Sequence, residues 1–264
     1  MSPLLRNNVR VTGSGMRTIV FGHGFGCDLN AWADVAPAFE TEARVVLFDH
    51  VGAGLSDLSA YDALKYGHLE GYAQDVIEIA SALVLQDAVF VGHSVSAMIG
   101  MLAAIKAPGL FGAMVMVCPS PRYVDDFPYV GGFSRADIDD LLEVLDANFL
   151  DWSRATTPAI MGNAERPELA RALGDSFCRT DPTIAKAFAR VTFLSDVRAS
   201  LPLLDLPTLI LQTQADMVAP IEVGEYMHVT LPSSELVLME ATGHCPHMSA
   251  PGETIATIKR FLAN

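Results

Sequence analysis

Residues 88–102 place a serine at a sharp turn between an apolar strand and a helix. The run Ala88-Val89-Phe90-Val91 predicts a buried strand, and the stretch from Ala97 to Leu102 predicts a helix. Ser94 lies at the apex between them, so its hydroxyl points outward above a helix N-terminus, a geometry known as a nucleophile elbow. Because a strand and a helix joined in this way belong to a parallel sheet, the segment predicts an α/β fold.

The turn departs in one place from the usual G-x-S-x-G pattern, because Ser96 stands where the second glycine is expected. Serine is among the smallest replacements for a glycine at a close crossing of helix and strand. We therefore expect Ser96→Gly to keep activity within about tenfold. The alternative reading of Ser94 is an ordinary N-cap after a buried strand.

A glycine-rich turn precedes this segment. The strand-like run Thr18-Ile19-Val20-Phe21 leads into Gly22-His23-Gly24-Phe25-Gly26. Loops of this kind turn a backbone N–H toward the nucleophile, and the residue after the serine supplies a second donor. We predict that the amides of Phe25 and Val95 form an oxyanion hole.

An acid and a histidine follow the serine in the order Ser, Asp, His. Asp216 comes after the β-rich run 208–212, and His244 comes after the strand-like run 235–240 and a glycine. Asp205 is a second acid nearby, but it precedes its strand and would lie at the opposite edge of the sheet. Ser94, Asp216 and His244 are therefore the predicted catalytic triad.

The segment Gly243-His244-Cys245-Pro246-His247 allows two alternatives. His247 could replace His244 as the base, although His244 directly follows the strand and glycine. The set His-Cys-x-His could also bind a metal. No second pair of soft ligands occurs elsewhere, so we expect no metal and no cofactor.

Short β-rich runs alternate with longer amphipathic stretches until about residue 120, and the pattern resumes near residue 202. This predicts a mostly parallel sheet flanked by helices, formed by residues 1–120 and 202–264. Residues 121–201 contain only helical patterns and are predicted to form a four-helix cap above Ser94. The predicted cap helices cover residues 134–148, 151–161, 167–177 and 181–194.

Aromatic side chains are frequent in the predicted cap. We expect Phe133, Trp152 and Phe193, with His93 beside the nucleophile, to line a substrate pocket. The alternative is that the aromatic residues form the internal core of the cap.

Composition limits the possible functions. The 264 residues are 51% hydrophobic and carry a net charge of −14, without a basic cluster, which argues against nucleic-acid binding and adsorption to acidic membranes. No stretch reaches the ~18 consecutive apolar residues of a transmembrane helix. The N-terminal segment is too polar for a secretory signal, and four scattered cysteines suggest a reduced, cytoplasmic protein.

Several motifs occur together in one order along the chain. They are Phe48-Asp49-His50-Val51-Gly52-Ala53-Gly54-Leu55-Ser56-Asp57, Val91 to Met98, Ser120-Pro121-Arg122-Tyr123, Gly131-Gly132-Phe133, Ser195-Asp196 and Gly243 to Ser249. Over nearly its whole length the chain resembles the RsbQ family of bacterial stress-signalling hydrolases and its plant relatives, the strigolactone and karrikin receptors. The form G-H-S-V-S resembles the plant branch, whereas Cys245-Pro246-His247-Met248 is more similar to RsbQ.

The resemblance implies an α/β-hydrolase fold, a four-helix cap over an apolar pocket, and the triad Ser94, Asp216 and His244. It also implies slow hydrolysis of small apolar esters or butenolide lactones. Two roles stay open. The protein could be a metabolic esterase or a perhydrolase, or it could be a ligand sensor, resembling RsbQ in its pairing with a PAS-domain phosphatase.

Overall fold

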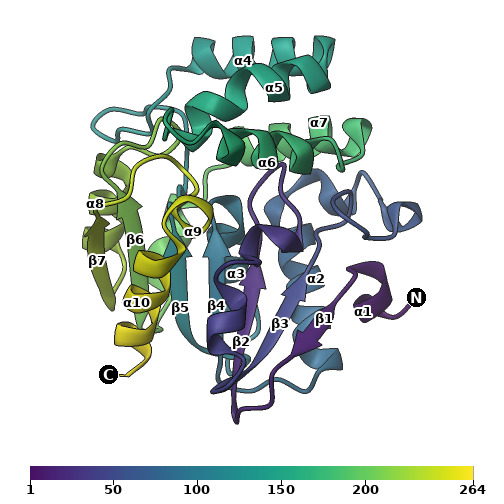
Figure 1. Ribbon diagram of the computed structural model, residues 1–264, viewed down its shortest axis with the longest axis vertical. Coiled ribbons are helices and arrows are strands. Elements are labelled where there is room, and N and C mark those ends of the chain that lie inside the picture. Colours follow the sequence, from purple (N-terminus) through teal and green to yellow (C-terminus); the bar gives the residue numbers. More distant parts are fainter. Residues whose placement is uncertain (264) are drawn as a thin grey trace.

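The computed structural model describes residues 1–263, which form a seven-stranded sheet with helices on both faces (Figure 1). The strand order is β1-β3-β2-β4-β5-β6-β7, and every neighbouring pair is parallel except β1 and β3. This confirms the predicted α/β-hydrolase fold with a mostly parallel sheet. The strands are β1 (Arg10–Thr12), β2 (Arg17–Gly22), β3 (Ala43–Phe48), β4 (Ala88–His93), β5 (Phe111–Val117), β6 (Thr208–Thr213) and β7 (Ser234–Met239).

Two hydrophobic clusters sandwich the sheet. One lies between the sheet and α2, α3 and α8, and the other lies beneath the short helical turns after β2 and the C-terminal α10. Strand β4 is buried along its full length at the centre of the sheet, as expected for a strand covered on both faces. The α-helices are α1 (Pro3–Arg6), α2 (Leu69–Ala82), α3 (Val95–Lys106), α4 (Arg135–Ala147), α5 (Phe149–Met161), α6 (Pro167–Phe177), α7 (Pro182–Phe193), α8 (Ile221–Thr230), α9 (Pro246–Ser249) and α10 (Pro251–Leu262).

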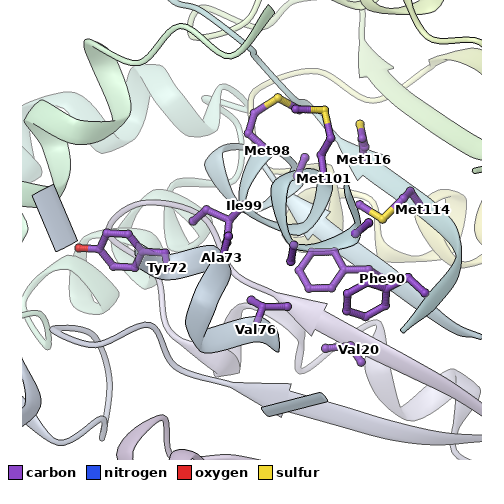
Figure 2. Close-up of a cluster of buried hydrophobic side chains, with 14 of the residues drawn as sticks. Val20, Tyr72, Ala73, Val76, Phe90, Met98, Ile99, Met101, Met114 and Met116 are labelled. Atoms are coloured by element: carbon purple, nitrogen blue, oxygen red, sulfur yellow. The ribbon is translucent and has the colours of Figure 1, made fainter. Parts of the chain in front are cut away.

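Sulfur-rich and aromatic side chains fill the first cluster. Figure 2 shows Met98 and Met101 of α3 near Met114 and Met116 of β5, with Phe90 of β4 below them. Methionine adapts its shape to irregular gaps, so these side chains close the space between α3 and the sheet. Helix α3 is thereby held rigidly under Ser94.

Helices α4 to α7 leave the sheet after β5 and stack above the carboxyl ends of the strands (Figure 1). Their starts are set locally, because Ser134, Asn148 and Asp181 accept hydrogen bonds from the first turns of α4, α5 and α7. We propose that residues 121–201 act as the cap and residues 1–120 with 202–264 as the core.

Named contacts join the cap to the core. Arg179, just after α6, pairs with the buried Asp28 at 2.6 Å, and the Asp181 amide donates to the Gly52 carbonyl at 3.1 Å. The His244 amide donates to the Ile160 carbonyl of α5 at 2.9 Å. No helix within residues 1–263 combines the length and apolarity needed to cross a membrane.

Candidate active site

The turn between β4 and α3 holds Ser94 in an uncommon backbone conformation. Its φ is 55° and its ψ is −126°, a region that side-chain-bearing residues rarely adopt outside functional sites. Gly92 permits the turn, because a Cβ there would lie 2.6 Å from the Ala97 nitrogen. The segment has the predicted elbow geometry, with the Ser94 hydroxyl above the N-terminus of α3.

Ser94, His244 and Asp216 form one chain of hydrogen bonds. The distance from Ser94 Oγ to His244 Nε2 is 2.9 Å, and His244 Nδ1 lies 2.7 Å from Asp216 Oδ2. All three residues are buried. Because the carboxylate accepts from Nδ1–H, Nε2 faces Ser94 Oγ in the position of a proton acceptor.

The loops after β6 and β7 fix the acid and the base. Asp216 Oδ1 accepts from the amides of Val218 at 2.8 Å and Ala219 at 3.1 Å. The Gly243 amide donates to the Ala215 carbonyl at 2.8 Å, which binds the two loops to each other. Asp216 is thus held as a hydrogen-bond acceptor that faces the imidazole.

The predicted oxyanion donors lie on the two backbone segments that flank the serine. A Cβ at Gly24 would lie 3.3 Å from Ser94 Cβ, so the loop that carries Phe25 packs directly against the nucleophile. Val95 is the first residue of α3. Among residues 1–263, neither the Phe25 amide nor the Val95 amide donates a hydrogen bond to another protein atom, so both remain available for an oxyanion.

The other two histidines near the triad have different surroundings. His93 Nε2 donates to the His244 carbonyl at 2.8 Å, which ties the catalytic loop to the nucleophile strand. The ring of His247 packs at a tilt against Trp32 with centroids 4.5 Å apart, and its nitrogens have no partner in the described part of the chain. Burial lowers the pKa of His247 to about 3, so this ring stays neutral, and neither of its nitrogens bonds to Ser94 within residues 1–263.

An apolar cavity of about 80 Å³ lies between the cap and the triad. The structure places all four predicted pocket residues, His93, Phe133, Trp152 and Phe193, in its wall, together with Ser94, His244 and Phe25. Neither an acidic side chain nor an arginine or lysine lines it. The space therefore accepts a small neutral group and disfavours a charged one.

Sequence reasoning missed Tyr123, whose hydroxyl lies 3.4 Å from Ser94 Oγ. Burial raises the pKa of this phenol, which keeps it protonated as a hydrogen-bond donor. Cys27 and Cys245 in the cavity wall were missed as well. The position of Tyr123 shortly after β5 was the available signal, because residues after parallel strands gather at the same edge of the sheet.

One group of possible metal ligands occurs within residues 1–263. The ligand atoms of Cys118, Asp216 and His244 lie within 4.8 Å of one another, whereas Cys245 and His247 are not part of such a group. A metal would require a thiolate, but burial raises the pKa of the Cys118 thiol well above its ordinary value. Asp216 and His244 are also already bonded to each other, which suits proton transfer better than metal binding.

Comparisons with known proteins agree with this geometry. Residues 17–251 match the family model for the alpha/beta hydrolase fold. The chain is 37% identical over 257 residues to Karrikin insensitive 2 receptor CA of Petunia hybrida, covering 97% of this chain and 95% of the receptor. It is 36% identical over 256 residues to Strigolactone esterase D14 of Arabidopsis thaliana, covering 97% and 96%.

Among solved structures, a hydrolase from Oleispira antarctica superposes with a TM-score of 0.96 at 41% identity, covering 99% of this chain and 96% of that one. A likeness of this extent includes the cap as well as the sheet. The family match, the fold and the Ser94 turn lead to one assignment. The chain belongs to the alpha/beta hydrolase fold family and is an α/β-hydrolase.

Proposed function

We propose that the protein is a serine hydrolase of small apolar esters or butenolide-type lactones. The observation that carries the proposal is the continuous hydrogen-bonded chain from Ser94 through His244 to Asp216, which opens into an uncharged cavity. Relatives whose printed names describe an esterase and a ligand receptor support this substrate class.

Acylation follows from the positions of the donors and acceptors. Ser94 Oγ attacks the carbonyl carbon while His244 Nε2 takes its proton, and Asp216 stabilises the imidazolium that forms. The carbonyl oxygen becomes an oxyanion and accepts from the Phe25 and Val95 amides, each of which contributes roughly 3 to 4 kcal/mol in comparable sites. His244 then gives the proton to the leaving oxygen, the C–O bond breaks, and an acyl-Ser94 ester remains.

Deacylation repeats these steps with water. His244 takes a proton from the water molecule as its oxygen attacks the acyl carbon, and the same amides hold the second oxyanion. Ser94 Oγ leaves and regains its proton from His244. For a lactone the leaving oxygen stays attached to the acyl group, so the product is a single hydroxy acid.

A substrate panel tests the proposal. We expect turnover of neutral short-chain esters and small lactones, with kcat/KM falling as the acyl chain outgrows the cavity or gains a carboxylate. Absence of turnover across the neutral panel, or a preference for charged substrates, would contradict it.

A second candidate is RsbQ-like stress signalling from a cytoplasmic location, in which the bound or hydrolysed state is read by a PAS-domain phosphatase. It is favoured by the receptor relatives and by the extent of the likeness, which covers 97% of the chain. Slow single turnover, together with ligand-dependent binding of such a phosphatase, is expected. Rapid multiple turnover without ligand-dependent association would favour a metabolic esterase instead.

A further inference from the structure

A second serine–histidine pair lies behind the oxyanion loop. His50 Nε2 lies 2.6 Å from Ser96 Oγ, and both residues are buried. His50 Nδ1 has no partner among the described residues, and no carboxylate occupies the place that Asp216 has beside His244. The pair therefore lacks the parts of a second triad, yet its serine stands only two residues after Ser94 in the chain.

The hydrogen bonds around this pair determine which atom of Ser96, His50 and His23 carries each proton. Ser96 Oγ donates to the His23 carbonyl at 2.5 Å, so it must accept from His50 Nε2–H. The His50 amide donates to His23 Nε2 at 3.1 Å, so the His23 ring carries its proton on Nδ1. That Nδ1–H donates to the Gly24 carbonyl at 2.9 Å. The tautomers agree at every step.

The Gly24 carbonyl and the Phe25 amide belong to the same peptide group. In a trans peptide the C=O and N–H bonds point in opposite directions. The His23 ring and the Cys27 amide, at 2.9 Å and 3.2 Å, both bind the Gly24 oxygen and so fix the direction of this carbonyl. The orientation of the Phe25 N–H is therefore set by the contacts that hold the neighbouring carbonyl.

We infer that His23, His50 and Ser96 form a neutral brace that positions the Phe25 amide in the oxyanion hole. Ser96 joins the first turn of α3, which carries the Val95 amide, to the His23 carbonyl of the loop that carries the Phe25 amide. This inference rests on the proposed function. The members of the brace are positioning residues, because none of them touches the reacting atoms.

Packing and charge around the brace fit this role. Gly22 makes room for the serine, because a Cβ at Gly22 would lie 3.2 Å from both Cβ and Oγ of Ser96. The His50 ring is enclosed by Phe48, Tyr72 and Phe188. Burial holds the pKa of His50 well below its ordinary value, so the ring stays a neutral donor to Ser96.

Ser96→Ala removes the hydroxyl while keeping the Cβ. Misplacing an oxyanion donor by a fraction of an ångström costs roughly tenfold or more, and we expect at least that loss in kcat with KM unchanged. An alkyl boronic acid, whose tetrahedral serine adduct places an oxygen in the oxyanion hole, should lose affinity by the same factor. An ether of the substrate's shape, which has no oxyanion, should bind equally well. Ser96→Gly also removes the hydroxyl, so the brace predicts a similar loss in that variant, whereas the turn pattern in the sequence predicts activity within about tenfold. Steady-state kinetics of Ser96→Gly decide between the two predictions.

Two variants of His50 separate positioning from structure. His50→Gln can place an amide N–H near the position of the histidine Nε2–H and should retain most of the activity. The kcat of His50→Leu should fall by about as much as that of Ser96→Ala. Combining His50→Leu with Ser96→Ala should cost little more than either change alone, because the brace acts as a unit. The concentration of active sites is measured by fluorophosphonate titration, and kcat is calculated per active site, so that unfolded protein does not lower its value.

The following results would overturn the inference. The brace has no positioning role if Ser96→Ala loses less than tenfold in kcat, or if ether affinity falls as much as boronic acid affinity, which would indicate general damage to the pocket. A wild-type protein that neither turns over esters nor reacts with the fluorophosphonate would overturn the proposed function itself, and the inference with it. An active wild type with an unaffected Ser96→Ala variant would overturn only the brace.

Discussion

His247 makes stability depend on pH in a way that the structure predicts quantitatively. The ring is fully buried against Trp32 and His93, and burial lowers its pKa to about 3. In the unfolded chain the pKa of a histidine is near 6.5. Because the folded-state pKa is the lower one, the neutral ring favours the folded state above pH 6.5, and this stability is lost as the pH falls toward 3.

The size of the effect follows from the two pKa values. A pH of 4.5 is two units below the pKa of the unfolded histidine. At this pH the histidine is protonated in the unfolded chain and still neutral in the folded protein. At 1.36 kcal/mol per unit, the free energy of unfolding falls by about 3 kcal/mol relative to pH 7.5 through this residue alone.

His247→Phe provides the matched comparison. Phenylalanine keeps an aromatic ring against Trp32, and the ring nitrogens that it replaces make no hydrogen bond within residues 1–263. Urea unfolding of both proteins at pH 7.5 and 4.5 should show that the wild type loses about 3 kcal/mol more than the variant. Ester turnover at pH 7.5 should change by only a few-fold, because within residues 1–263 His247 neither bonds to Ser94 nor lines the cavity.

A parallel loss of stability in the two proteins would refute this reasoning. It would mean that His247 is protonated in the folded state or accessible to water. A loss of several orders of magnitude in turnover would instead assign His247 a direct part in catalysis.

Two further predictions concern the cap and the acid. Trp152 packs against both Phe25 and Phe177 and lines the cavity. Trp152→Ala should shift kcat/KM toward bulkier esters across a size series, with little change for the smallest ester. A loss of 3 to 5 kcal/mol in stability with an unchanged preference profile would show that it serves only the core of the cap. Asp216→Asn should lower kcat by about 10⁴-fold with a similar melting temperature, because the amide favours the wrong tautomer of His244. A loss below tenfold would remove Asp216 from the triad.

Local signals predicted the sheet and the serine turn well. The runs 88–91 and 208–212 read as strands because buried parallel strands are continuously apolar, and the structure has strands at both places. The edge strand β1 was missed, since its three residues are exposed and carry no such pattern. Helix α10 was not predicted either, although it covers one face of the sheet.

In the candidate site, too, local sequence patterns predicted some features, whereas others depend on contacts between distant residues. The positions of Ser94 and His244 after strands were readable, because a parallel sheet gathers the ends of its strands at one edge. The bonds of Ser96 to His23 and His50 were not, because they join residues 73 and 46 positions apart whose pairing depends on the folded packing. In the sequence Ser96 is visible only as a substituted glycine.

Mass spectrometry of the fluorophosphonate-treated protein tests the central claim most directly. We expect one adduct per chain, on Ser94; it should be lost in Ser94→Ala and form at the same residue, though more slowly, in Ser96→Ala. An adduct on any other residue, or undiminished labelling of Ser94→Ala, would contradict the assignment of Ser94 as the nucleophile.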